Sequence, residues 1–119
     1  MAIILNIDTA VEAASICLAK KGESLRLEIN SRQKDHASWL HPTIQKIAVD
    51  TGIDLKDLEA VAVTIGPGSY TGLRVGLSAA KGLSFALNIP LICINTLELM
   101  AYAGIENEAD LICPLIDAR

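Results

Sequence analysis

Apolar residues gather in short runs that predict the buried strands of a sheet. The runs at residues 3–7, 60–65 and 91–94 contain hardly any polar residues, which is typical of strands that are covered on both faces. Such strands belong to the centre of a domain, so these three runs are expected to form its core.

A hairpin is predicted between residues 14–19 and 25–29, because these segments flank the turn sequence of residues 20–23. In the second segment Arg26 and Glu28 alternate with apolar residues. Their side chains are therefore expected to point outward, away from the core.

Helical spacing of apolar residues appears in the remaining segments. Trp39 to Ile47 follows it up to Gly52, a suitable C-terminal cap. Other helices are expected at residues 54–58, with Asp54 as cap; between the N-cap Ser69 and Asn88; and at residues 97–103, between the cap Thr96 and Gly104.

Three meandering strands followed by alternating helices and strands predict an α/β fold, with a mixed five-stranded sheet and helices on both faces. One domain is expected over residues 1–110. Because the apolar run 111–116 echoes residues 5–10, residues 111–119 are expected to be the first strand of a truncated second domain. The alternative, that the run joins the first sheet, stays open.

The composition argues against unaided nucleic-acid binding and against a secreted or membrane-spanning protein. Aromatic residues are only 3% and the net charge is −4, so the chain lacks the stacking platforms and basic stripe that unaided nucleic-acid binding needs. Cys17, Cys93 and Cys113 lie in apolar runs without CxxC spacing, which predicts reduced core thiols in a cytoplasmic protein. We expect no signal peptide and no membrane-spanning segment, since the apolar runs are short.

The stretch from Ile65 to Leu87 is the most unusual in composition. Gly66-Pro67-Gly68 predicts a tight turn between a strand and a helix. Gly72 and Gly76 then fall inside the helix, where each costs about 1 kcal/mol relative to alanine. They form a small-residue face with Ala79, Ala80 and Leu83. Two explanations remain open: a helix of another subunit packs closely on this face, or the face packs on the protein's own sheet.

A candidate phosphate site combines Asp8, at the end of the first strand, with the backbone amides of residues 66–71 at a helix N-terminus. Strand-terminal aspartates also cap turns, and the residues leave both interpretations open. Residue 71 is threonine, so the dinucleotide fingerprint is not met. His36 and His41 are spaced differently from a zinc-binding pair, and Ser69 has no base visible in the sequence.

The sequence resembles the TsaB (YeaZ) family, which is related to TsaD and the older glycoprotease group. Five segments carry the resemblance in matching order: ILNIDTA, HASWLHPTIQKI, GPGSYTGLRVGLSAAKGL, IPLICINTLELMA and PLIDAR. It implies an actin-like (ASKHA-type) fold of two ribonuclease-H-like halves, of which this chain is the first. It also implies a bacterial cytoplasmic protein that takes part in forming N6-threonylcarbamoyladenosine at position 37 of tRNAs that read ANN codons.

The resemblance further implies a non-catalytic subunit that binds and activates a TsaD-like transferase. A TsaE-like ATPase would join the complex, tRNA would be reached only through it, and the subunit alone would form a homodimer. No cofactor is required, although ATP or ADP could lie at the partner boundary, near Asp8, Gly66, Gly68 and Ser69. The alternative function is an actin-like ATP-dependent enzyme or a metal-dependent peptidase. Ala10 and His41 depart from the patterns of nucleotide-binding and metal-binding relatives, which favours the non-catalytic hypothesis.

The partner interface implied by the resemblance lies on two helices. Its residues are Trp39, Thr43, Ile47, Ser69, Tyr70, Thr71, Gly72, Arg74, Val75, Gly76, Ala79, Ala80 and Leu83. On this hypothesis Gly76→Leu leaves the fold largely intact but prevents pairing, because a bulky side chain would push the two helices apart.

Overall fold

A mixed five-stranded sheet forms the centre of the domain in the computed structural model, which describes residues 2–31 and 35–103. Its strands are β1 (Ile3–Asp8), β2 (Ala14–Lys20), β3 (Glu23–Asn30), β4 (Ala60–Gly66) and β5 (Leu91–Asn95), in the order β3-β2-β1-β4-β5. Neighbouring strands among β1, β2 and β3 are antiparallel, whereas β4 pairs in parallel with both β1 and β5. The α/β class and the mixed sheet expected from the sequence are confirmed.

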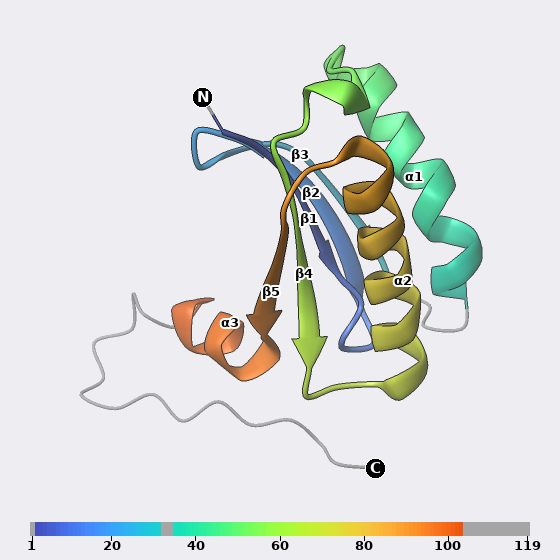
Figure 1. The fold of residues 1–119 in the computed structure, drawn as a ribbon. Helices are drawn as coiled ribbons and strands as arrows, with labels where there is room; N and C mark the ends of the chain where they lie inside the picture. The colour runs from blue at the N-terminus through green and yellow to red at the C-terminus, as the bar shows by residue number, and fades with distance from the viewer. Residues whose placement is uncertain (1, 32–34, 104–119) are drawn as a thin grey trace.

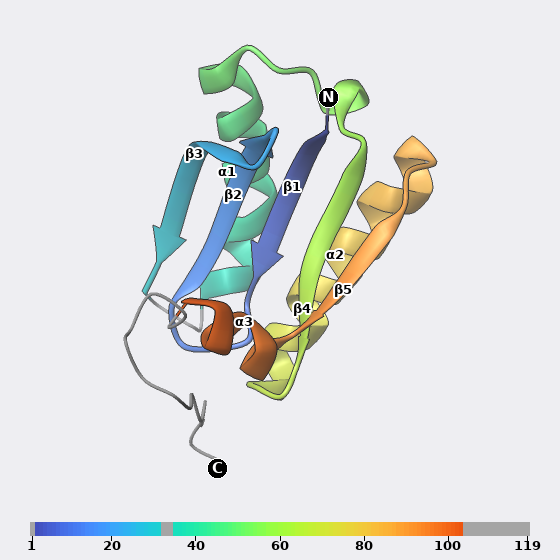
Figure 2. The ribbon, with the colours of Figure 1, turned by 90° about the vertical axis from the view of Figure 1, so that its left-hand side faces the viewer.

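Helices lie on both faces of this sheet, as expected. Figure 1 shows α1 (His36–Thr51) and α2 (Tyr70–Leu87) side by side on one face. Figure 2 shows the opposite face, where α3 (Thr96–Ala103) crosses in front of the strand ends. The short 3-10 helix η2 (Leu55–Asp57) leads from α1 into β4. Within the described ranges no helix combines the length and apolar character needed to cross a membrane.

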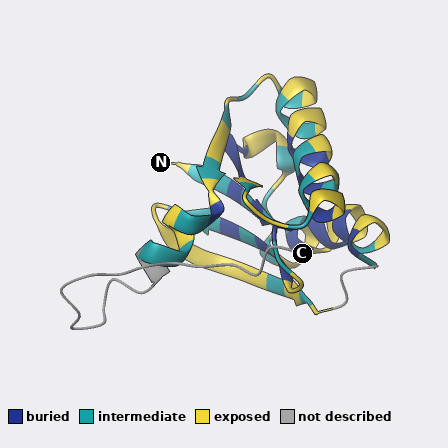
Figure 3. Cartoon of the chain, turned by 90° about the horizontal axis from the view of Figure 1, so that it is seen from below, coloured by how far each residue is buried: buried dark blue, intermediate teal, exposed yellow. Residues whose placement is uncertain are grey.

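The hydrophobic core lies between the sheet and the helix pair α1 and α2. Alternate residues of β1, β2 and β4 point toward the helices, whose inner sides are buried and whose outer sides are exposed (Figure 3). The core residues are Leu5, Ile7, Ile16, Leu18, Leu40, Ile44, Ile47, Leu58, Val61, Val63, Ala79 and Ala80. These core residues are all aliphatic, as the low aromatic content predicts, and the half-buried Trp39 packs against them.

Several turns and caps follow the local signals in the sequence. Lys21 and Gly22 both have positive φ angles, 55° and 79°, which gives the two-residue hairpin turn that matches the twist of the strands. The Ser69 side chain accepts a hydrogen bond from the Gly72 N–H, and Gly52 closes α1 in the left-handed conformation. Asn88 closes α2 in the same way. These predictions are confirmed.

The expected direction of Arg26 and Glu28 is wrong. Arg26 pairs with Leu18 in the sheet register and therefore points toward α1, where its guanidinium reaches Asp50 at 3.5 Å. The hydrogen bond from Arg26 lowers the pKa of the Glu28 carboxyl, which also pairs with Lys46 of α1 at 3.4 Å. Leu27 and Ile29, which pair with Cys17 and Ser15, face away from the helices and are exposed. Leu25, at the irregularity in the register, is exposed as well.

The N-terminal cap of α3 is Asn95 and not Thr96. The Asn95 Oδ1 accepts hydrogen bonds from the N–H groups of Leu97 (2.8 Å) and Glu98 (3.2 Å). The Thr96 hydroxyl is buried and makes no hydrogen bond. The sequence analysis expected Thr96 because threonine is a capping residue directly before the apolar run, but asparagine is the stronger cap and the turn begins one residue earlier.

Asn95→Ala is expected to lower the free energy of unfolding by about 1 kcal/mol, because two N–H groups lose their acceptor. Thr96→Val has the same shape without the unpaired hydroxyl, so its expected effect is neutral or stabilising. Urea unfolding of both variants measures the difference. If Thr96→Val were the more harmful substitution, the assignment of the cap to Asn95 would be wrong.

Cys17 and Cys93 lie in different environments. Cys17 is half-buried in β2 and Cys93 is exposed on β5, so the expected core position is wrong for Cys93. Gly104, Cys113 and the expected domain start at residues 111–119 lie outside the described residues.

Candidate functional site

The glycine face of α2 packs against its own domain, at the loop that follows β1. Thr9 is fully buried there, and its Oγ1 donates a hydrogen bond of 2.5 Å to the carbonyl oxygen of Gly72. A Cβ atom added at Gly72 would overlap the Thr9 carbonyl oxygen, and one added at Gly76 would overlap Thr9 Oγ1. Of the two explanations that the sequence left open, packing on the protein's own sheet is therefore correct.

This packing corrects the sequence-based hypothesis about Gly76→Leu. That hypothesis expected an intact fold and lost pairing, but a leucine at residue 76 would displace Thr9 and approach Ile7 of β1. Gly72, Gly76, Ala79 and Ala80 are all buried within the domain. Gly72 and Gly76 are unsuitable as contacts for another subunit, because Thr9 already occupies the space beside them.

Two groups of the candidate phosphate site, the Asp8 carboxylate and one backbone amide, are engaged in hydrogen bonds within the domain. Asp8 Oδ1 accepts from the Thr64 hydroxyl (2.7 Å) and from the Ala10 N–H (3.2 Å). The Ser69 N–H, one of the amides expected to bind an anion, donates to the Ala10 carbonyl oxygen at 2.7 Å.

The glycine turn beside Asp8 is filled by the same loop. A Cβ atom at Gly68 would overlap Ala10, and the positive φ of Gly66, 122°, is closed to other residues. Asp8 and this turn therefore hold the β1 loop against α2. This is the turn-capping interpretation that the sequence left open.

Part of the predicted interface does lie on the outer side of the helix layer. Tyr70, Thr71 and Arg74 are exposed, and Ser69, Trp39, Val75 and Leu83 are half-buried. Thr43 and Ile47 of α1 are buried, as are the small residues Gly72, Gly76, Ala79 and Ala80 of α2. The structure therefore divides the predicted set between the core and the surface.

A groove of about 530 Å³ runs along the outer side of the helix layer, between α1 and α2. Its walls are mainly apolar or small side chains: Ala37 and His41 of α1, and Arg74, Val75, Ser78, Ala79, Gly82 and Leu83 of α2. Beyond the groove, α2 exposes Phe85 by 89% and Tyr70 by 73%. An exposed apolar groove, on a helix that also exposes aromatic rings, is the kind of surface that a partner helix buries.

The sequence analysis missed Ala37, His41, Ser78, Gly82 and Phe85. A signal for α2 was present, because Tyr70, Arg74, Lys81 and Phe85 repeat at intervals of four, seven and four residues and so share one side of a helix. That side is opposite to the glycine face. The sequence analysis considered the glycine side of α2 as the partner surface, but that side packs on the Thr9 loop of the same domain.

The two histidines are in different environments. His36 is buried, with its Nδ1 3.2 Å from the Asn30 side-chain amide and its Nε2 without a hydrogen bond. His41 is exposed and lines the groove. In the described part of the chain, no three His, Cys, Asp or Glu side chains come together as a metal site would require.

Comparison with known proteins identifies the family to which the chain belongs. The family model described as TsaD, tRNA N6-adenosine threonylcarbamoyltransferase, matches residues 27–119. The tRNA threonylcarbamoyladenosine biosynthesis protein TsaB of Haemophilus influenzae is 38% identical over 98% of the chain, as is that of Escherichia coli. The chain belongs to the TsaB (YeaZ) family.

The structural match agrees with this membership. YeaZ from Pseudomonas aeruginosa superimposes with a TM-score of 0.90 at 32% identity, over all of this chain and 56% of that one. RuvC of Thermus thermophilus, at 18% identity and a TM-score of 0.55, shares the fold alone. The chain spans 49% of the Haemophilus influenzae TsaB and 50% of the Escherichia coli TsaB, about half of each.

Proposed function

We propose that this TsaB-family chain acts in tRNA threonylcarbamoyladenosine biosynthesis as a pairing subunit, which binds a TsaD-like transferase through the outer side of α1 and α2. The observation that carries the proposal is the apolar groove between these helices, together with the exposed rings of Tyr70 and Phe85 on α2. The TsaB names of its relatives supply the process.

The shape of the groove favours a helical partner. Two parallel ridges of side chains, from α1 and α2, leave a channel into which the side chains of another helix can pack. Ser78 and Gly82 are small, exposed residues of its lining, so a partner helix can come close to α2 there without displacing large side chains. The buried inner sides of α1 and α2 hold both ridges in place.

The role is that of a subunit that positions and activates the transferase. Asp8 accepts hydrogen bonds from the Thr64 hydroxyl and the Ala10 N–H, and these bonds hold the loop that follows β1. This supports a structural role for Asp8 and not a catalytic one. A TsaE-like ATPase and the tRNA would contact this chain only within the assembled complex.

Ser78→Trp tests the pairing surface. The side chain at residue 78 points into the groove and is exposed, so tryptophan should fill the groove with little effect on folding. We expect the affinity for the TsaD-like transferase of the same organism, measured by titration calorimetry, to fall at least tenfold.

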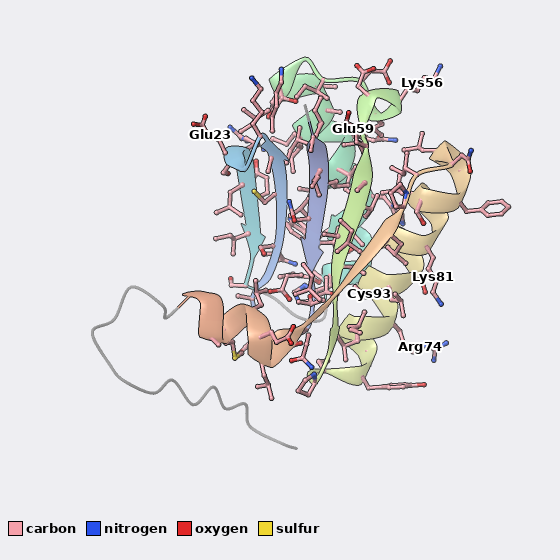
Figure 4. All side chains as sticks on the ribbon, turned by 60° about the vertical axis from the view of Figure 1, so that its left-hand side comes forward. Glu23, Lys56, Glu59, Arg74, Lys81 and Cys93 are labelled. Carbon is pink, nitrogen blue, oxygen red and sulfur yellow. The ribbon has the colours of Figure 1, made fainter. Side chains whose placement is uncertain are left out.

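Glu23→Trp is the matched control, because it places the same bulky ring at an exposed position at the start of β3, remote from the groove (Figure 4). Its affinity should equal that of the unmodified protein. Unchanged affinity for Ser78→Trp, with both variants folded by circular dichroism, would refute the proposed surface.

A further inference from the structure

The outer edge of β3 has no neighbouring strand. Among the described residues β3 pairs only with β2, and it is the first strand in the order β3-β2-β1-β4-β5. Figure 2 shows it at one side of the sheet. The N–H and C=O groups along such an edge can bind a further strand.

The side chains of β3 leave this edge without its usual protection. Sheet edges are commonly protected by charged side chains or proline. Here the charges are directed to the helix side, where Arg26 reaches Asp50 and Glu28 pairs with Lys46. They are held against α1 and do not cover the opposite face of the strand.

That opposite face of β3 is apolar and exposed. Leu27 is 53% exposed and Ile29 is 61% exposed. The irregularity in the register with β2 lies opposite Leu25, so residues 26–30 form a regular ladder. A regular, apolar edge strand is suited to pairing with another strand.

The sequence of β3 is complementary to itself when two copies run antiparallel about Leu27. In that register Leu27 lies opposite Leu27 of the second copy, and each Arg26 lies opposite a Glu28. Residues directly opposite each other share one face of a sheet, so apolar side chains meet on one face and opposite charges on the other. A register centred on Arg26 or on Glu28 would place like charges opposite each other, which is destabilising.

We propose that β3 pairs with β3 of a second copy of this chain, antiparallel and centred on Leu27, so that one sheet continues through both copies. The contact is isologous, because a two-fold axis at Leu27 makes each cross-strand pair occur twice. No residue of β3 lines the groove between α1 and α2. The inference therefore concerns a separate surface and does not rest on the proposed function.

Cysteine cross-linking tests the register in the full chain. The background carries serine in place of Cys17, Cys93 and Cys113, because Cys17 pairs with Leu27 in the sheet and would compete for the new thiol. In this background Leu27→Cys should give a disulfide-linked dimer under mild oxidation. Opposite Cα atoms of an antiparallel pair lie about 4.5–5.5 Å apart, within the range that a disulfide spans.

Ile29→Cys in the same background is the matched control. In the proposed register the two copies of residue 29 are four residues apart along the strands, about 13 Å, so they should not cross-link. Ile29 is more exposed than Leu27, so cross-linking by random collision would favour residue 29. Equal cross-linking at the two positions, or none at residue 27, would overturn the proposal.

Sedimentation velocity over a range of concentrations measures the association without a cross-link. Pairing along one strand edge is a small contact, so the dimer should form at high protein concentration. Leu27→Lys should weaken it at least about tenfold, because two like charges then face each other at the two-fold axis. A chain that stays monomeric throughout, or a dimer that Ser78→Trp abolishes and Leu27→Lys leaves unchanged, would show that β3 is not the surface that binds a second copy.

Discussion

Gly76→Leu is expected to lower the free energy of unfolding by about 3 kcal/mol or more, the upper end of the cost of overpacking a core. The new side chain would enter the space of Thr9 Oγ1 and approach Ile7 Cγ2. Thr9 is fully buried and bonded to the Gly72 carbonyl, so it has no room to move aside. Since domains of this size are stable by only about 5–15 kcal/mol, the shift in a urea unfolding curve should be large.

The control for this variant lies on the same helix. Gly82→Ala adds a methyl group where no heavy atom lies within 4 Å, so only the helix propensity changes. Alanine there should stabilise the protein by about 0.5–1 kcal/mol. A Gly76→Leu variant that unfolded at the same urea concentration as the unmodified protein would mean that α2 does not pack on Thr9.

Those elements that depend on local chemistry could be predicted from the sequence. The hairpin turn, the Ser69 cap and the left-handed Asn88 each depend on residues within four positions of one another. Short-range hydrogen bonds and φ preferences decide such features, and they act wherever the segment lies. The five strands follow from equally local runs of apolar residues.

The partner of the glycine face could not be predicted, because it is distant in sequence. The Thr9 hydroxyl meets the Gly72 carbonyl across 63 residues. Glycines at helical spacing require that something approaches closely, but they do not say what approaches. A neighbouring subunit and the protein's own β1 loop satisfy the same pattern.

The face of β3 was mispredicted for a related reason. Alternation along a strand separates two sets of residues, but which set meets the helices depends on the register with β2 and on α1. Arg26 and Glu28 meet α1 because Lys46 and Asp50 there provide opposite charges. The apolar set, including Leu27 and Ile29, faces away from the helix pair.

Two adjacent residues of α1, Leu40 and His41, should affect different properties: Leu40 the stability of the fold and His41 the binding of the partner. Leu40 is buried in the core with 1% exposure, and Leu40→Ala should destabilise the domain by about 2–5 kcal/mol, because it removes packed atoms and leaves a cavity. His41 is exposed on the wall of the groove, so His41→Ala should change the stability by less than about 0.5 kcal/mol.

The order of the two variants should reverse when affinity for the transferase is measured instead of stability, at a temperature where both variants are folded. His41→Ala removes a side chain that a partner in the groove would contact, so its affinity for the transferase should fall, whereas folded Leu40→Ala should bind more nearly as the unmodified protein does. The two helices would then act as a rigid support whose inner sides determine stability and whose outer sides determine the partner. A His41→Ala variant as unstable as Leu40→Ala would show that α1 is rotated about its axis relative to this structure, and the groove would then have other walls.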